Sequence, residues 1–241
     1  MPYDVTLDPP PSQVARPTPL LPELALLIYS RGSEHLLLKH PVEALPGGRC
    51  TLGAGVPLTP GDLDHLAAYL TGTGMRLTGS TTLAVGMNSV AWWVPPGARA
   101  LLFDAKYAQT ASIAALSGRA VPLPGLVMVA TPGQLRVFAV RGAARPTAST
   151  PLMNAPFWNI FSSHAMCRGT VKYPSLCTPD TQEAWELAFF QSVFTGPSRQ
   201  DKYMNWGRSY QELLEQALHD HAFPEDVLVE AKLTLADILT Q

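Results

Sequence analysis

The residues in this chain best suited to chemistry lie in one short segment, residues 156–169, which reads Pro-Phe-Trp-Asn-Ile-Phe-Ser-Ser-His-Ala-Met-Cys-Arg-Gly. No regular period runs through it, and its paired serines interrupt any strand. Ordered irregular segments on a rigid scaffold often carry binding and catalytic residues. We therefore expect this segment to present Cys167 at a functional site. The alternative is a loop that lines the core with an inert, buried thiol.

Cys167 needs help to react, because a free thiol with a pKa of about 8.5 is mostly protonated at neutral pH. His164 lies three residues before it and Arg168 directly after it, and either could favour the thiolate. A thiol needs less activation when its partner arrives already activated as a thioester. Such a site needs an exposed cysteine and one oriented side-chain amide, which stabilises the oxyanion as the acyl group moves to an amine. Asn159 fits that part.

Other site chemistries lack the spacing that they require. The sequence has no phosphate loop, no dinucleotide-binding glycine fingerprint after a strand and no Gly-x-Ser-x-Gly elbow. Cys167 and Cys177 are ten residues apart, and His219 and His221 are two apart; neither spacing is usual for a chelate. We therefore predict no metal site.

The composition favours a folded cytoplasmic protein. The chain has 241 residues, 46% hydrophobic and 15% charged, which allows a sizeable core. A formal net charge of −2 argues against direct nucleic-acid binding. No apolar run approaches the roughly 18 to 20 residues of a membrane span, and residues 1–22 lack the apolar centre of a signal peptide. Three cysteines make no even disulfide set, so we expect a reducing cytoplasm.

The N-terminal third divides into an arm and a small unit. Seven prolines predict a flexible, extended arm over residues 1–22. A strand and helix unit is predicted over residues 23–75. It opens with apolar runs at 24–29 and 34–39, split by four residues that indicate a hairpin. Thr59 and the proline after it then begin a helix.

The core is predicted over residues 76–198 as an α+β fold, an antiparallel four-stranded meander flanked by helices. The Pro-Gly pair between the last two strands is typical of a tight reversal. The predicted strands cover residues 83–94, 98–103, 126–130 and 135–140.

Helices are predicted to follow the cysteine segment. Ala184, Trp185, Ala188 and Phe189 give one helix an apolar face. Residues 199–241 are predicted to form C-terminal helices. These are an amphipathic helix over residues 209–220 and a second helix over residues 224–233, which a proline begins.

A meander, then an asparagine, then a cysteine eight positions later, then helices, resembles the ubiquitin-conjugating enzyme (UBC) fold. In that family a His-Pro-Asn motif precedes the catalytic cysteine, with its asparagine at the spacing of Asn159 from Cys167. Phe157 and Trp158 stand where the motif has His and Pro. Four blocks are similar, more narrowly, to the PRTRC system protein B family, a prokaryotic branch named for a cassette of ParB-related and ThiF-related genes. These blocks are residues 52–59, 155–159, 166–169 and 189–195.

The resemblance implies a ubiquitin-like conjugation reaction. A ThiF-like activating enzyme would adenylate the C-terminus of a small ubiquitin-like protein, and Cys167 would accept that protein as a thioester. Asn159 would assist its transfer to an amine, while His164, Arg168 and Tyr173 would shape the site. ATP would be used by the activating enzyme, so the chain itself would need no cofactor. Other cassette proteins would be further partners.

Two alternatives remain beside this cysteine transferase. The first is a catalytically inactive UBC-fold adaptor that holds partners encoded by a plasmid-borne ParB/ThiF-related cassette. The second is a cysteine peptidase, which needs a histidine brought to Cys167 from a distant segment. Outside the cysteine segment, the upstream candidates are His35, His40 and His65. Formation of a thioester with the activating enzyme and the modifier separates the transferase from the adaptor.

Overall fold

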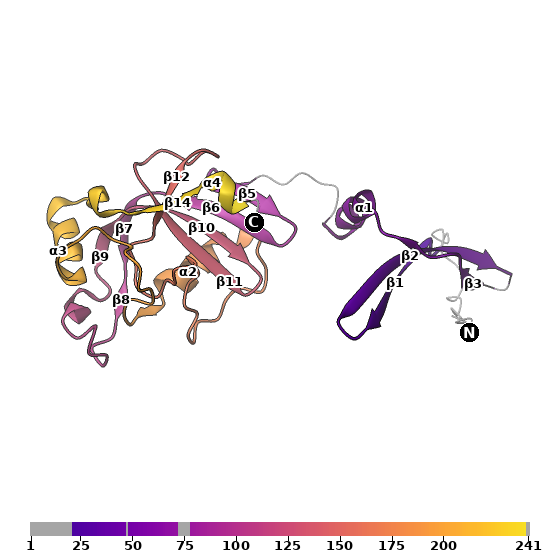
Figure 1. The fold of residues 1–241 in the computed structure, drawn as a ribbon, viewed down its shortest axis with the longest axis horizontal. Helices are drawn as coiled ribbons and strands as arrows, with labels where there is room; N and C mark the ends of the chain where they lie inside the picture. The colour runs from indigo at the N-terminus through magenta and orange to yellow at the C-terminus, as the bar shows by residue number, and fades with distance from the viewer. Residues whose placement is uncertain (1–20, 47, 72–77, 240–241) are drawn as a thin grey trace, which may run out of the picture. The chain divides into compact units, whose positions relative to one another are not determined.

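The computed structural model describes residues 21–46, 48–71 and 78–239, with the backbone alone at residues 64 and 68–71. Contacts divide the chain into two compact units, Met1–Met75 and Arg76–Gln241 (Figure 1). Up to residue 20, the predicted proline-rich arm lies outside the described residues.

The N-terminal unit is a small antiparallel sheet followed by a helix. β1 (Leu24–Arg31) pairs along its whole length with β2 (Glu34–Leu45). The end of β2 pairs with β3 (Arg49–Leu52), and Leu38 and Lys39 of β2 pair with β4 (Val56–Pro57) on the edge away from β1. Gly32 turns the first hairpin with a φ of 60°, a conformation that glycine adopts without strain. The predicted hairpin is therefore confirmed, as is the helix, α1 (Pro60–Thr71).

The second unit is built on a six-stranded sheet with the order β14-β12-β11-β10-β6-β5, in which every neighbouring pair is antiparallel. The predicted hairpin at its centre is confirmed, with Gly133 in the turn at a φ of 75°. The bounds of the strands are β5 (Thr82–Gly86), β6 (Ser89–Val94), β10 (Gly125–Thr131), β11 (Gln134–Val140), β12 (Pro151–Asn154) and β14 (Glu230–Thr234).

The α+β fold class is confirmed, but the strands are divided differently from the predicted four. The run over residues 83–94 is a hairpin, because the chain turns at Met87 and Asn88 between β5 and β6. The run over residues 98–103 lies outside the main sheet. Its two halves pair elsewhere: β7 (Gly97–Ala100) with β9 (Ala120–Leu123), and β8 (Leu102–Phe103) in parallel with β13 (Val193–Phe194).

Helices cover both faces of the sheet. α2 (Gln182–Phe190) and α3 (Tyr210–Asp220) pack on one face, where Trp185 and Leu213 are fully buried in the larger hydrophobic core. On the other face, α4 (Leu235–Leu239) packs on a smaller core around Val127 and Phe138 (Figure 1). Three short 3-10 turns complete the unit: η1 (Ile113–Leu116), η2 (Pro179–Thr181) and η3 (Glu225–Val227).

The predicted last helix, residues 224–233, is wrong. The segment contains η3 and then β14, which adds an edge strand beside β12. Two observations explain the difference. β12 offers unpaired backbone groups to any adjacent chain, and the N–H of Asn154 already bonds the carbonyl of Val229 at 2.8 Å. Lys232 has a φ of 59°, which a helix cannot contain. Tertiary pairing overrides helix propensity here.

Candidate functional site

The cysteine segment is a short irregular hairpin laid against β11. The backbones of Ile160 and Met166 pair with each other, and the Cys167 N–H donates to the Asn159 carbonyl at 2.6 Å. The returning arm continues the sheet, since the Met166 N–H donates to the Leu135 carbonyl at 2.8 Å. The structure therefore explains the eight-residue spacing between Asn159 and Cys167. It places Asn159 and Cys167 opposite each other at the open end of this hairpin.

Asn159 is held in place through both ends of its side chain. It is 8% exposed, and its Nδ2 donates to the Val193 carbonyl at 2.8 Å. Its Oδ1 accepts from the N–H and the hydroxyl of Thr195, each at 3.3 Å. Its φ of 59° lies in the left-handed region, where asparagine is among the least strained non-glycine residues. Asn159 thereby ties the start of the hairpin to β13.

Cys167 is partly exposed rather than sealed in the core. The Tyr173 hydroxyl lies 3.5 Å from the carbonyl of Met166, the residue before Cys167, and burial raises the pKa of the Tyr173 phenol to about 12. Arg168 donates from Nε to the Val171 carbonyl at 2.9 Å, and its guanidinium lies over the Tyr173 ring at 5.1 Å. The structure therefore brings Asn159, Tyr173 and Arg168 close to Cys167 in the fold, and Tyr173 is a neutral phenol at pH 7.

His164 lies against a different cluster. Its ring stacks on Phe138 at 4.4 Å between centroids, on the face of the sheet that carries the smaller core. Its pKa is lowered to about 4, mainly by burial; the charges of Arg199 and Arg136 contribute to the lowering, and Asp201 opposes it. Because the imidazole is uncharged at neutral pH, it adds no positive charge beside the thiol. The site-shaping role of His164 stays a prediction.

The buried imidazole of His164 should make the fold sensitive to acid. The unfolded chain takes up a proton near pH 6.5, whereas the folded chain resists protonation until about pH 4. The free energy of unfolding should therefore be level above pH 6.5 and fall by about 1–2 kcal/mol between pH 6.5 and 4, allowing for the partial exposure of the ring. His164 has a φ of 65°, which asparagine also tolerates. His164→Asn should therefore keep the backbone conformation and lack this fall in the free energy of unfolding. Urea unfolding of both proteins at pH 7 and pH 4.5 measures it, and an equal loss in both would contradict the prediction.

A buried arginine, which the sequence analysis did not single out, supports the turn of the cysteine segment. The Arg199 side chain is 2% exposed and bonds both carboxylate oxygens of Asp201, at 2.8 and 2.5 Å. It also donates to the side-chain oxygen of Asn154 on β12, at 3.2 Å. Asp201 in turn accepts from the hydroxyl of Ser162 at 2.9 Å, and the arginine holds the pKa of that carboxyl well below its usual range. No local sequence pattern marks the contacts to Asn154 and Ser162, which join residues about forty positions apart.

A comparison with protein families identifies the family of the chain. The model of prokaryotic E2 family D matches residues 64–231, well over half of the chain. The chain belongs to prokaryotic E2 family D. E2 proteins act in ubiquitin-like conjugation, with an activating enzyme and a ubiquitin-like protein as their general partners. No curated protein and no solved structure matches the chain.

The matched E2 span contains the whole cysteine hairpin, α2 and β13, but begins inside α1. The histidines considered for a peptidase, His35, His40 and His65, belong to the other unit. Within the described ranges, no three His, Cys, Asp or Glu side chains gather as a metal site would require. None of the helices described is long and apolar enough to cross a membrane.

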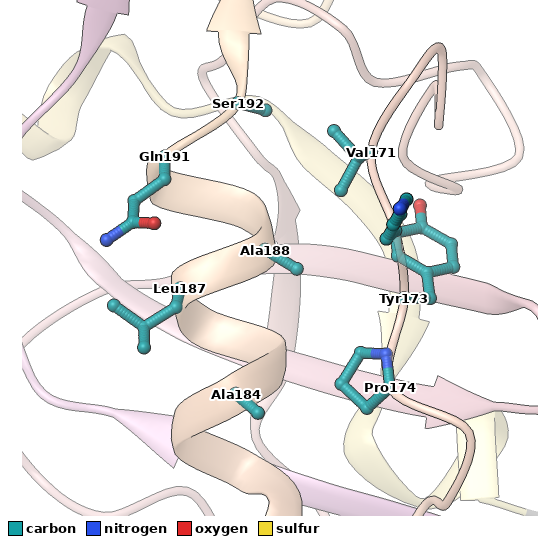
Figure 2. A pocket seen from close by; sticks show the side chains of 9 residues that line it. Val171, Tyr173, Pro174, Ala184, Leu187, Ala188, Gln191 and Ser192 are labelled. Atoms are coloured by element: carbon teal, nitrogen blue, oxygen red, sulfur yellow. The ribbon is translucent and has the colours of Figure 1, made fainter.

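A surface groove with a volume of about 520 Å³ adjoins the E2 cysteine segment. One wall is the chain from Val171 to Pro174, and the other is α2, from which Ala184 and Ala188 face that wall (Figure 2). The groove ends at Ser192, next to the Val193 carbonyl that accepts from Asn159. Residue types and spacing do not predict this groove, because it depends on how its two walls pack against each other in the folded chain.

Proposed function

We propose that this chain is an active conjugating enzyme that carries a ubiquitin-like protein as a thioester on Cys167 and passes it to an amine. One observation carries the proposal. Within a chain of the E2 family, Cys167 is partly exposed, and its backbone is held at 2.6 Å by the carbonyl of an asparagine eight residues earlier. A partly exposed cysteine on a fixed backbone meets the demand of a reaction in which the incoming thioester is already activated.

In this proposal Asn159 has two tasks. Through its main chain it positions Cys167, and through its side chain it stabilises the oxyanion that forms during acyl transfer. An amide nitrogen carries two hydrogens. Among the described residues, Nδ2 has one acceptor, the Val193 carbonyl, which leaves a second hydrogen for the oxyanion. Tyr173 and Arg168 pack on each other beside the thiol and form one border of the site.

The partners follow from the same chemistry. A ThiF-like enzyme would use ATP to activate the modifier, so this chain would act without a cofactor of its own. The groove between Tyr173 and α2 suits an extended chain end, because five of its nine lining residues are apolar and one wall starts at Val171, four residues after Cys167. The resemblance to PRTRC system protein B suggests that these partners are encoded in one cassette.

The test is a loading reaction with the cassette's activating enzyme, its small modifier and ATP. We expect an adduct that a thiol reductant removes from the wild-type chain and that is absent from Cys167→Ala. Cys167→Ser should form an ester that resists the reductant but is cleaved by hydroxide. Cys50→Ala is the matched control, because Cys50 is also partly exposed but lies in the other unit; it should load normally. Failure of the wild-type chain to load, with an activating enzyme shown to adenylate the modifier, would favour the adaptor.

A further inference from the structure

Among the strands that the structure describes, β1 forms an edge of the N-terminal sheet. Of the described strands, only β2 pairs with β1. The Val42 N–H donates to the Glu23 carbonyl at 3.0 Å, so residue 23 turns its backbone groups toward β2. Antiparallel strands alternate between residues that bond the neighbouring strand and residues that point away from it. The backbone groups that point outward therefore belong to Leu24, Leu26, Ile28 and Ser30.

This unit buries almost nothing by itself. Among its described side chains, His40 alone is buried, and no hydrophobic one is. Leu24, Leu26 and Ile28 follow one face of β1 and are 47%, 40% and 70% exposed. A small sheet gains most of its stability in water from a packed hydrophobic face, and on β1 that face is exposed. The edge from Leu24 to Ser30 also lacks the proline or charged residue that proteins commonly place on exposed edges to prevent pairing.

We propose that β1 pairs with β1 of a second copy of this chain, in an antiparallel two-fold arrangement centred on Leu27. In that register the outward residues meet as hydrogen-bonded pairs, Leu24 with Ser30 and Leu26 with Ile28. The two-fold axis makes each pair occur twice, and pairing uses the one open edge of β1 on each chain, so this contact closes at a dimer. The sheets of the two copies become one continuous sheet through β2, β1, β1 and β2.

The charges of Glu23 and Arg31 favour this register over registers shifted by two residues. With Leu27 at the centre, Glu23 lies opposite Arg31 of the second copy at both ends of the pair. A slip of two residues in one direction places Glu23 opposite Tyr29, and a slip in the other places Arg31 opposite Ala25. Opposite charges directly across an antiparallel pair stabilise it. Arg31 contacts Glu34 of its own hairpin at 2.6 Å, but both side chains are largely exposed, so that ion pair can rearrange at little cost.

The first test is the association of the full chain by sedimentation equilibrium. We expect a wild-type dimer at micromolar concentrations. Glu23→Arg places two arginines opposite each other at both ends and should raise the dissociation constant at least tenfold. Adding Arg31→Glu restores opposite charges and should bring it back toward the wild-type value. A wild-type chain that remains monomeric at 100 μM, as it would if its own second unit or another protein covered the edge, overturns the proposal.

The second test reads the register by disulfide trapping under mild oxidation. Leu27→Cys should give a disulfide-linked dimer, because a central residue faces its own copy across a non-hydrogen-bonded pair, where side chains come closest. Leu26→Cys and Ile28→Cys are matched controls that would face their own copies only after a two-residue slip, so they should remain at the wild-type background. Equal trapping in all three variants, or trapping in a control instead, would contradict the register. Neither test depends on Cys167 chemistry, so this proposal can fail or hold independently of the proposed function.

Discussion

Asn159→Asp is expected to slow the transfer of the acyl group from Cys167 to an amine about 100-fold. Aspartate matches the shape of asparagine, tolerates the φ of 59° and still offers an oxygen to Thr195. It has no amide hydrogen for the Val193 carbonyl, which accepts at 2.8 Å, and none for the oxyanion. The measurement is the rate at which preloaded thioester disappears after a free amine is added.

Thr195→Val is the matched control for this change. It removes the hydroxyl contact to Asn159, at 3.3 Å, but leaves both amide hydrogens in place. Its transfer rate should stay close to that of the wild type. Urea unfolding of both variants separates lost chemistry from lost structure. If Asn159→Asp transfers the acyl group at the wild-type rate, the asparagine amide takes no part in the reaction.

Phe157→Ala is expected to lower the free energy of unfolding by about 3–5 kcal/mol. Phe157 is 1% exposed. Its ring centroid lies 5.4 Å from that of Phe189 on α2 and 6.3 Å from that of Phe194 on β13. Truncation leaves a cavity where the start of the cysteine hairpin meets α2 and β13. The loss can be measured by urea unfolding at pH 7, where His164 does not titrate.

Phe161→Ala makes the same chemical change four residues later in the same segment. Phe161 is 42% exposed, so its truncation should cost no more than about 0.5 kcal/mol. Similar losses for the two variants would mean that the packing of Phe157 does not anchor the segment. A Phe157→Ala protein too unstable to purify would still agree with the expected direction, and Phe157→Leu, with a smaller loss, would then supply the measurement.

The sequence predicts local features of this fold well, because short-range physics determines them. The first hairpin needs only Gly32 between two apolar runs, and the central hairpin needs only the reversal at Gly133. The wrong helix over residues 224–233 comes from pairing between distant segments, because nothing local in β14 distinguishes it from a helix until β12 offers an edge. The turn at Asn88 is different: Gly86, Asn88 and Ser89 are turn-forming residues, and the prediction of one strand over residues 83–94 overlooks that local signal.

The candidate site shows the same contrast between local features, which the sequence predicts, and contacts between distant segments, which it does not. The eight-residue spacing of Asn159 and Cys167 predicts their proximity, because one short hairpin contains both residues. The partners of the Asn159 side chain lie more than thirty residues later, on β13, and Arg199 reaches the segment through Asp201 and Ser162. Such contacts depend on the assembled core, so the types and spacing of the residues alone could not predict them.

The left-handed backbone at Asn159 bears on how natural variation at this position should be interpreted. Few residues adopt a φ of 59° without strain, and fewer still can both donate to one carbonyl and accept from Thr195. Geometry alone would therefore keep asparagine at position 159 through evolution, even in a descendant that had lost its thiol. Persistence of the asparagine among homologues is thus poor evidence of catalytic activity. Joint retention or joint loss of Cys167 and the groove residues of α2 would be better evidence of whether the activity is kept.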